Sequence, residues 1–213
     1  ETLFRQWFVE EAGEDWEEVA LSQVVLKANT GLDAIKRAPI VEEETGIKCL
    51  RIQDVSQNKP YIKWGNSCVK ESDFTRAQIV KNDIIMARTC SPGIIFYARE
   101  DLQAVFNNGL ARIKTDLSKT YPIFLYYLFK TDDFIGHIYG ISDGTSVQLN
   151  MKLGDLLSYK FKLPPKHLQD KYFSVFNAID NKTHYNKKQI GILIDLRETM
   201  IPHLISGKIL TKF

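Results

Sequence analysis

Residues 164–205 read PPKHLQDKYFSVFNAIDNKTHYNKKQIGILIDLRETMIPHLI. After the two prolines, this stretch has no further proline until Pro202 and contains one glycine, Gly191. Apolar side chains recur every three or four residues, at Leu168, Tyr172, Val175, Ile179, Ile190, Leu193, Leu196, Met200 and Leu204. The spacing predicts a long amphipathic helix that pairs with another helix, although Thr183 and Asn186 interrupt the near-heptad pattern. At 1.5 Å per residue the helix would be roughly 55–60 Å long, so we expect it to project from a globular head.

The composition is that of an ordinary soluble domain with an appendage. Hydrophobic residues make up 44% of the 213 residues and charged residues 25%, so a substantial core can form. No apolar run approaches about 18 residues, and we therefore expect no membrane span. The first residues, ETLFRQWF, lack the basic and apolar regions of a secretion signal.

The cysteines give no sign of a disulfide framework or a zinc site. Cys49, Cys68 and Cys90 are an odd and widely spaced set, which favours a reducing compartment. A zinc site needs closely spaced cysteine or histidine pairs, and none of the four histidines lies near a cysteine in the sequence. We predict a cytoplasmic protein with buried or incidental thiols and no metal.

Charge is distributed unevenly along the chain. Residues 1–22 carry one basic and seven acidic side chains, whereas residues 158–213 carry ten basic and four acidic ones. The residues between them are nearly balanced, with 17 basic and 15 acidic side chains. The basic helix is suited to phosphates, but a solvated lysine-rich helix face explains its charge equally well.

Short apolar segments bounded by turns predict the strands of the head. They cover 47–52, 83–87, 93–98, 103–106, 110–114 and 159–163. We expect Asn107-Asn108-Gly109 to join two of them as a hairpin. Residues 118–135 are expected to form one helix, with Pro122 in its first turn and Ser118 or Thr120 as its cap. Irregular polar loops are predicted at 28–46, 56–76 and 136–152.

The predicted fold class is therefore α+β, a strand-rich mixed α/β head followed by a long C-terminal helix. We assign residues 1–12 to the end of a preceding helix of the same kind, 13–163 to the head and 164–213 to the C-terminal helix. Residues 1–8 align with residues 198–205, with two identities and all four apolar positions shared. This match predicts one unit of a tandem repeat, either a fragment of a longer chain or a half-length protein.

No catalytic constellation stands out in the sequence. The glycine-spaced loop at 140–146 lacks the lysine of a phosphate-binding loop. The segment Leu163-Pro164-Pro165-Lys166 lacks both the amide and the aromatic residue of the Asn-Pro-Pro-aromatic motif of amino-methyltransferases. Solvation explains the carboxylate pair Asp132-Asp133. We therefore expect a protein that is not an enzyme and carries no cofactor of its own.

The order of several segments resembles the DNA specificity subunits of type I restriction–modification systems. The segments are LFRQWFV (3–9), DWEEVAL (15–21), LRIQDV (50–55), VKNDIIMAR (80–88), GTSVQL (144–149), LPPKHLQ (163–169) and IPHLISGKI (201–209). Two features depart from the family. Such subunits usually carry two recognition domains and two spacer helices, whereas this chain has one of each. Also, Arg88 is followed by Thr89-Cys90-Ser91, where many relatives place a glycine.

The resemblance implies a non-catalytic unit that recognises double-stranded DNA. The head would read one half of a split target sequence. The C-terminal helix would be a spacer that pairs with a second spacer, including in a homodimer, and docks methyltransferase subunits. S-adenosylmethionine would belong to those subunits, and ATP and Mg to a restriction or motor subunit. The recognised bases depend on loop geometry and are not predicted.

Loops that read bases need basic or bidentate side chains, with others that hold phosphates. The predicted DNA contacts are Lys36, Arg37, Lys59, Lys63, Lys70 and Arg88, with Asn29, Thr30 and Lys152 as further candidates. Each of them is also compatible with a solvated surface residue. Tyr61 and Trp64 are expected to pack within their loop rather than to stack on bases.

Two other classes of function remain open. A scaffold protein could dimerise through the long helix without contacting DNA, and salt-dependent binding to mixed-sequence duplex DNA would distinguish it. An enzyme that acts on carbohydrates or nucleotides would need an acid–base site, for which the sequence gives no candidate.

Overall fold

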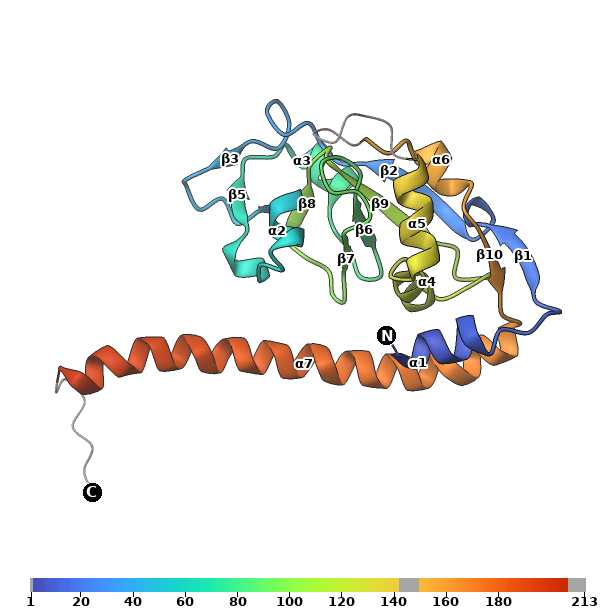
Figure 1. Cartoon of the computed structure of the whole chain (residues 1–213). Helices are drawn as coiled ribbons and strands as arrows, with labels where there is room; N and C mark the ends of the chain where they lie inside the picture. The colour runs from blue at the N-terminus through green and yellow to red at the C-terminus, as the bar shows by residue number, and fades with distance from the viewer. Residues whose placement is uncertain (1, 142–149, 207–213) are drawn as a thin grey trace, which may run out of the picture. The chain divides into compact units, whose positions relative to one another are not determined.

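The computed structural model describes residues 2–141 and 150–206 (Figure 1). The chain divides into two compact units, residues 1–169 and 170–213. One segment that carries the family resemblance, residues 144–149, lies outside the described residues, and so do residues 207–209 at the end of another. The predicted fold class is confirmed, because the first unit mixes strands with short helices and one long helix ends the described chain.

In the described part of the first unit, the strands form three sheets. The smallest pairs β1 (Glu17–Ala20) with β10 (Lys160–Leu163). The first four-stranded sheet is antiparallel, in the order β2 (Val25–Thr30), β9 (Leu110–Thr115), β6 (Ile84–Ala87) and β7 (Ile95–Tyr97). The second four-stranded sheet has the order β3 (Ile40–Val41), β5 (Gly65–Ser67), β4 (Lys48–Leu50) and β8 (Ala104–Phe106).

Short helical segments lie between these strands. They are α1 (Thr2–Arg5), the π-helical η1 (Gln6–Glu10), η2 (Leu21–Gln23), α2 (Ile52–Ser56), η3 (Tyr61–Lys63), α3 (Glu71–Ala77), α4 (Pro122–Leu128), α5 (Asp132–Ile141) and α6 (Leu153–Leu157). Each of the six predicted strands overlaps an observed one, namely β4, β6, β7, β8, β9 and β10, and β9 extends one residue beyond its predicted end. The polar loops predicted at 28–46 and 56–76 are less irregular than expected, because β3, β5, η3 and α3 lie within or across them.

The two four-stranded sheets share the main core. All four residues of β6, Ile84 to Ala87, are buried, as expected for an apolar run without alternation. Leu50 and Phe106 of the second sheet belong to the same buried cluster as Ile85 and Leu110 of the first sheet. The loops at the ends of these strands therefore start from a well-packed base.

The first residues form a helical segment that packs on α4. Phe4 and Phe8 are buried, and their ring centroids lie 5.4 and 5.2 Å from that of Phe124. A spacing of four residues places both rings on one side of the segment. The helix predicted at the start of the chain is thus confirmed, although its second half, η1, is a π-helix.

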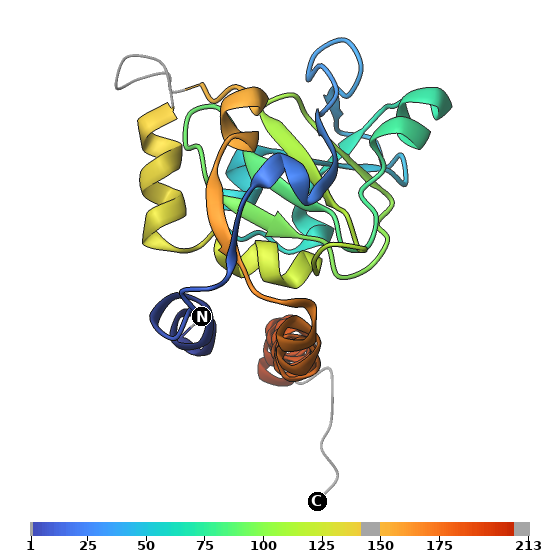
Figure 2. The ribbon, with the colours of Figure 1, turned by 90° about the vertical axis from the view of Figure 1, so that its right-hand side faces the viewer.

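Strands β1 and β10 join the two ends of the head. They pair antiparallel, with Glu17 opposite Leu163, and Figure 2 shows them side by side. Val19 and Phe161, which face each other across the pair, are both buried. The chain therefore enters and leaves the head through adjacent strands.

The single helix predicted over residues 118–135 is wrong, because two helices occupy this region. α4 starts at Pro122 as expected, whereas α5 continues to Ile141 through part of the predicted loop. Thr131 separates the two helices, since its hydroxyl oxygen accepts the N–H of Phe134 at 3.3 Å. Such a cap starts a new helix. The apolar spacing continues across the break, so it does not reveal that one helix ends and another begins.

The predicted caps of α4 are also wrong. Tyr121 occupies the cap position and makes no side-chain capping hydrogen bond. The hydroxyl of Thr120 is buried and donates to Oε1 of Gln169 at 2.8 Å. The hydroxyl of Ser118 donates to Oδ1 of Asp116 at 2.7 Å, within a tight turn. Both hydroxyls thus stabilise contacts outside the helix.

The hairpin predicted at Asn107-Asn108-Gly109 is wrong as well, because β8 and β9 lie in different sheets. The turn carries the chain from one sheet to the other. The N–H of Asn108 donates to the carbonyl of Leu32 at 2.8 Å. Asparagine and glycine indicate a sharp turn, but they do not specify which strand pairs with which.

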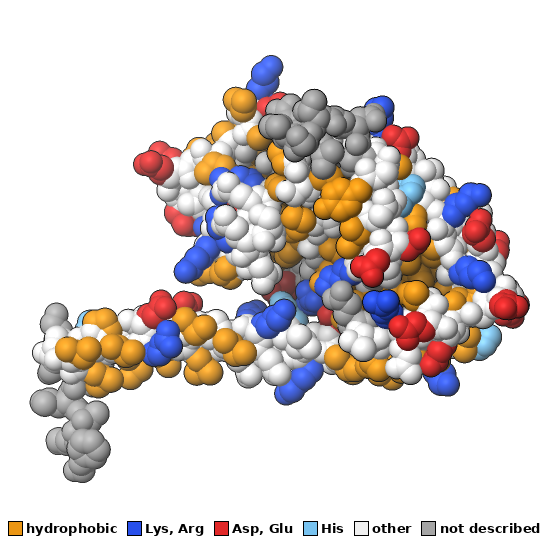
Figure 3. All heavy atoms as spheres, in the orientation of Figure 1, with side chains coloured by type: hydrophobic (Ala, Val, Ile, Leu, Met, Phe, Trp, Pro, Cys, Tyr) orange, Lys and Arg blue, Asp and Glu red, His pale blue; other side chains and the backbone are white. Residues whose placement is uncertain are grey.

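Helix α7 (Lys166–Ile205) forms most of the second unit and is continuous over 40 residues. This confirms the long C-terminal helix, about 60 Å in length at 1.5 Å per residue. Thr183, one of the two interruptions of the apolar pattern, stays helical and donates its hydroxyl to the carbonyl of Ile179 at 2.8 Å. Figure 3 shows hydrophobic side chains gathered along the C-terminal half of α7.

Candidate nucleic-acid interface

Several of the loops predicted to contact DNA start where strands of the first sheet end. Thr30 at the end of β2 lies opposite Ala111 in β9, and Ala87 at the end of β6 lies opposite Leu110. Because β2 and β6 both run antiparallel to β9, they end on the same side of the sheet. The loops after β2 and β6 therefore leave the sheet together.

The second sheet contributes strand ends at the same place. β4 and β8 run parallel, with Leu50 opposite Phe106. The N–H of Asn107 donates to the carbonyl of Leu50 at 3.2 Å, and the N–H of Leu32 donates to the carbonyl of Phe106 at 2.9 Å. These bonds connect the segments that follow β2, β4 and β8.

Arg88 connects two further segments to this edge. Its N–H donates to the carbonyl of Gly109 at 3.0 Å, and its carbonyl accepts the N–H of Met151 at 2.8 Å. Its guanidinium donates to the carbonyls of Met151 and Asn108 and to Oδ1 of Asn150, at 3.3, 3.4 and 3.0 Å. This predicted DNA contact is thus engaged within the chain. We call the following segments the strand-end loops: 31–38, 51–60, 88–93, 107–109 and 150–152.

Two glycines allow the strand-end loops to approach so closely. A Cβ atom on Gly31 would lie 2.2 Å from the carbonyl oxygen of Phe106 and 2.3 Å from that of Asn107. A Cβ atom on Gly109 would lie 2.8 Å from Cδ1 of Ile52. A side chain at position 31 would overlap backbone atoms, which cannot rotate away, so glycine is required there.

The loop 31–38 carries Lys36 and Arg37, whose side chains differ in their interactions. Nε of Arg37 donates to Oδ2 of Asp73 at 3.0 Å, and its Nη2 pairs with the other carboxylate oxygen. This pairing lowers the pKa of the Asp73 carboxyl and raises the pKa of Arg37. Lys36 is exposed. Lys36 can therefore reach a phosphate directly, whereas Arg37 ties its loop to α3.

The lysines of the second predicted loop also differ. Nζ of Lys59 lies 3.4 Å from Oδ1 of Asp54, a buried carboxylate that also accepts Nε of Arg51 at 3.0 Å. Lys63, in η3, and Lys70, just before α3, are exposed. Lys63 and Lys70 project into solvent, while Lys59 helps to hold α2.

The aromatic residues of this loop pack within it, as predicted. Trp64 is buried and its Nε1 donates to the carbonyl of Lys59 at 3.0 Å. The ring of Tyr61 lies edge-on to that of Trp64, with centroids 5.4 Å apart, and its hydroxyl donates to the carbonyl of Gln103 at 3.3 Å. These contacts leave Trp64 no face for stacking on a base.

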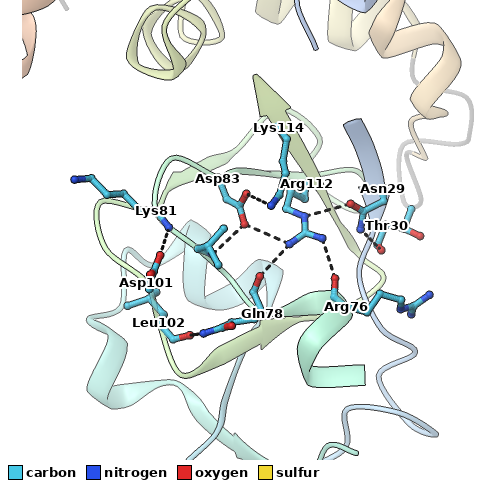
Figure 4. Close-up of polar contacts among 11 residues, drawn as sticks. Asn29, Thr30, Arg76, Gln78, Lys81, Asp83, Asp101, Leu102, Arg112 and Lys114 are labelled. Atoms are coloured by element: carbon cyan, nitrogen blue, oxygen red, sulfur yellow. Dashed lines mark hydrogen bonds and ion pairs between the residues drawn. The ribbon is translucent and has the colours of Figure 1, made fainter. Parts of the chain in front are cut away.

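Asn29 and Thr30 were expected in a loop but lie in strand β2. Oδ1 of Asn29 accepts Nε of Arg112 at 3.2 Å, and Nδ2 donates to the carbonyl of Thr30 at 3.0 Å (Figure 4). Asn29 is therefore held by its neighbours, whereas Thr30 is exposed. Lys152, the last candidate, is exposed at the start of α6.

Arg112 is the important residue that the sequence did not single out. Its side chain is 5% exposed, and Nη1 and Nη2 donate to the carbonyls of Gln78 and Arg76, both at 2.9 Å. Nη1 also lies 3.4 Å from Oδ2 of Asp83, whose side chain is 2% exposed (Figure 4). Burial raises the pKa of the Asp83 carboxyl, and the charges of Arg112 and Lys114 act in the opposite direction. An arginine inside the apolar run LARI is the signal that could have revealed it.

The chemistry available at the strand-end loops is that of hydrogen bonding and positive charge. Exposed lysines suit phosphate oxygens, and loop side chains at a fixed edge suit base edges. Within residues 2–141 and 150–206, no group of three or more histidine, cysteine, aspartate or glutamate side chains is arranged to hold a metal ion.

Comparison with known proteins decides the family. The profile described as "Type I restriction modification DNA specificity domain" matches residues 13–194. The chain belongs to this family. A curated relative, the type I restriction enzyme MjaIX specificity subunit of Methanocaldococcus jannaschii, is 24% identical over 235 residues, covering 97% of this chain and 51% of the relative. The chain thus spans about half the length of that specificity subunit.

Solved structures of specificity subunits share the fold of this specificity-domain chain. The S subunit from M. genitalium superposes with a TM-score of 0.64 at 16% identity, covering 90% of this chain and 46% of that one. The HsdS subunit from Thermoanaerobacter tengcongensis gives a TM-score of 0.54 at 15% identity, covering 88% and 44%. The profile match confirms the family resemblance inferred from the sequence, and the solved structures show the shared fold.

Membership of the specificity-domain family agrees with one expectation drawn from the sequence. Specificity subunits of type I systems are non-catalytic, which fits a chain whose sequence offers no catalytic constellation. No helix within the described ranges is both long and apolar enough to cross a membrane.

The predicted pairing positions all lie on α7. Leu168 and Tyr172 are half-buried, and the side chains that follow are 38–62% exposed: Val175, Ile179, Ile190, Leu193, Leu196, Met200 and Leu204.

Proposed function

We propose that the strand-end loops bind double-stranded DNA and read one half-site of a bipartite target. Membership of the specificity-domain family supports recognition of DNA sequence. The observation that carries the proposal is the meeting of loops from both four-stranded sheets at one edge, with Lys36 exposed beside them. A fixed edge of this kind can place several side chains against one stretch of duplex at the same time.

Lys36, Lys63 and Lys70, whose side chains are exposed, are the proposed direct contacts to phosphate, and Lys152 stays a further candidate. Arg37, Lys59 and Arg88 have carboxylate or carbonyl partners within the chain, so we assign them the task of holding their loops in place. Asn29 belongs with this second group because of its bond to Arg112, whereas Thr30 is exposed beside the strand-end loops. This division refines the contact set predicted from the sequence.

In the same proposal, α7 is a spacer that pairs with a second spacer helix. Its exposed apolar positions support this role, because a stable lone helix in water would present polar side chains on all sides. The pair would set the distance between two half-sites and dock methyltransferase subunits. Those subunits would supply the S-adenosylmethionine chemistry, and a motor subunit would supply ATP-driven cleavage. A cytoplasmic location follows from such partners.

The test is a salt titration of duplex binding with single substitutions. Each phosphate contact contributes about −0.9 to the slope of log K against log salt concentration. Lys36→Ala should lower affinity and reduce the magnitude of the slope by about that amount. The matched control is Lys119→Ala, because Lys119 is an exposed lysine in the turn after β9, at the opposite end of that strand.

The alternative scaffold role predicts a different result. A protein that only dimerises through α7 would show no salt-dependent binding to mixed-sequence duplex, and Lys36→Ala would behave like Lys119→Ala. That outcome would remove the DNA-binding role and leave the pairing role of α7 intact.

A further inference from the structure

Ile35 is the most exposed large hydrophobic side chain among the described residues, with 84% of its surface accessible. It lies in the strand-end loop 31–38. Single exposed aliphatic residues are common on protein surfaces, so exposure alone assigns no role. Ile35 differs from such residues in the way the backbone beneath it is held.

Four hydrogen bonds to Asp33 fix the turn that carries Ile35. Oδ1 of Asp33 accepts the N–H of Ile35 at 3.0 Å and that of Lys36 at 2.7 Å. The carbonyl of Asp33 accepts the N–H of Arg37 at 3.1 Å and that of Ala38 at 2.9 Å. Every backbone N–H from Ile35 to Ala38 thus has the same residue as its acceptor, and the turn has little freedom.

The turn is also fastened to the body of the head on both sides. Leu32 and Ala38 are buried in the core, and the pair between Arg37 and Asp73 ties the turn to α3. Since a β-branched side chain has few rotamers, Ile35 points into solvent in a defined direction. A rigid group of this kind loses little conformational freedom on binding.

The chemistry of DNA limits what such a group can contact. The base edges in the major groove present hydrogen-bond donors and acceptors and one apolar group, the C5-methyl of thymine. Ile35 has no hydrogen-bonding atom in its side chain, so the methyl is its only complementary feature there. Lys36, the next residue, is exposed and can hold a neighbouring phosphate at the same time.

We propose that Ile35 is a specificity-determining residue that contacts the methyl group of one thymine in the half-site. This inference rests on the proposed DNA-binding function of the strand-end loops. It assigns Ile35 to base reading and Lys36 to positioning, two roles within one turn.

The experiment starts by selecting bound duplexes from a random-sequence pool with the full chain. Each thymine of the selected sequence is then replaced singly by deoxyuridine, which lacks only the methyl group. At one position, the unsubstituted protein should lose about fourfold in affinity, which corresponds to burying one methyl-sized apolar group. For Ile35→Ala the same replacement should change affinity by less than about 1.5-fold, with every other position unaffected.

Leu117→Ala is the matched control. Leu117 is 60% exposed in a turn of the same kind, in which Asp116 accepts the N–H groups of Ser118, Lys119 and Thr120. This turn follows the last residue of β9, whereas the loop of Ile35 adjoins its first residues. Leu117→Ala should therefore keep the full sensitivity to deoxyuridine.

The outcomes separate this inference from the proposed function. Failure to select any sequence would overturn DNA recognition by this chain, and the inference with it. A selected sequence whose thymine preference is the same in Ile35→Ala would overturn the inference alone. The inference would also be overturned if Ile35→Ala lost the same affinity for the duplex with thymine as for the duplex with deoxyuridine. That result is expected of a side chain wedged between base pairs.

Discussion

Arg37 and Asp73 are 36 residues apart in the sequence, yet Nε of the arginine donates to Oδ2 of the aspartate at 3.0 Å. The pair joins a strand-end loop to the start of α3, and it gives Arg37 a different role from that of its neighbour Lys36. The side chain of Asp73 is buried, whereas that of Arg37 stays 41% exposed while its guanidinium is held by the carboxylate.

Replacing either partner should therefore have the same consequence. Arg37→Ala and Asp73→Ala should lower the thermal midpoint by similar amounts, and the double variant should lower it no further, because one contact is lost in all three. Differential scanning fluorimetry measures the midpoints. If Arg37 instead contacted DNA directly, Asp73→Ala would free its guanidinium and raise affinity for duplex, which a parallel binding titration would detect.

Arg112→Met should destabilise the fold by about 3–5 kcal/mol, because it leaves Asp83 buried without its closest cation and two carbonyls without donors. Urea denaturation followed by tryptophan fluorescence gives the free energy of unfolding. Lys114→Met is the control. Its ammonium lies 3.7 Å from Asp83 and is 34% exposed, so its loss should cost less than about 1 kcal/mol. Equal losses for both variants would contradict the central role of Arg112.

Gly31→Ala should destabilise by about 3 kcal/mol or more, because the new methyl group would overlap two backbone carbonyl oxygens. The same change at Gly136, in α5, should stabilise by about 0.5–1 kcal/mol, since nothing lies within 4 Å of its Cβ position. Both values come from the same denaturation series. A neutral Gly31→Ala would show that the strand-end loops are less tightly apposed than described.

The three cysteines should react at different rates with a maleimide. Burial raises the pKa of the Cys49 thiol to about 12, so its thiolate is on the order of one in ten thousand at pH 8. Cys68 and Cys90 are exposed. Mass spectrometry of the folded protein at pH 8 should show two fast additions, with a third only after denaturation. Cys49→Ser should leave both fast additions in place and abolish the addition that requires denaturation.

Leu193→Glu should prevent α7 from pairing with a second copy of the chain. Leu193 is one of the predicted pairing positions on α7 and is 62% exposed. Burying a carboxylate at such a position in a helix pair is unfavourable. Sedimentation velocity over a concentration series should show a shift from dimer to monomer. Lys187→Glu, a charge change at an exposed polar position of the same helix, should leave the dimer unchanged. A chain that is monomeric without any substitution would refute pairing between copies.

Local sequence patterns predicted the helices and strands of this fold better than they predicted which strands pair with each other. The apolar spacing of α7 and the apolar run of β6 each depend on nearby residues, and both were correct. The strand on each side of Asn107-Asn108-Gly109 was also correct, but their pairing was not. Pairing is decided by core residues far apart in the sequence, such as Leu50 against Phe106, and a turn signal carries no information about them.

The same limit explains the outcome for the candidate contacts. A lysine in a polar loop is exposed in most cases, and this expectation is correct for Lys36, Lys63 and Lys70. The partners of Arg37 and Lys59 are aspartates that only the folded chain brings close. Arg112 lies in a correctly predicted strand, but its acceptors are carbonyls of a distant segment, which no residue pattern in the sequence specifies.

The pairing of β1 with β10 has a consequence for how new specificities can arise. Since the polypeptide crosses the boundary of the head on two neighbouring strands, one recombination event within each strand replaces all strand-end loops together. The helical segments on either side keep their own sequences and their own partners. The head is in this sense a cassette. Under the proposed function, its exchange would change the half-site that is read and leave the helical segments unchanged.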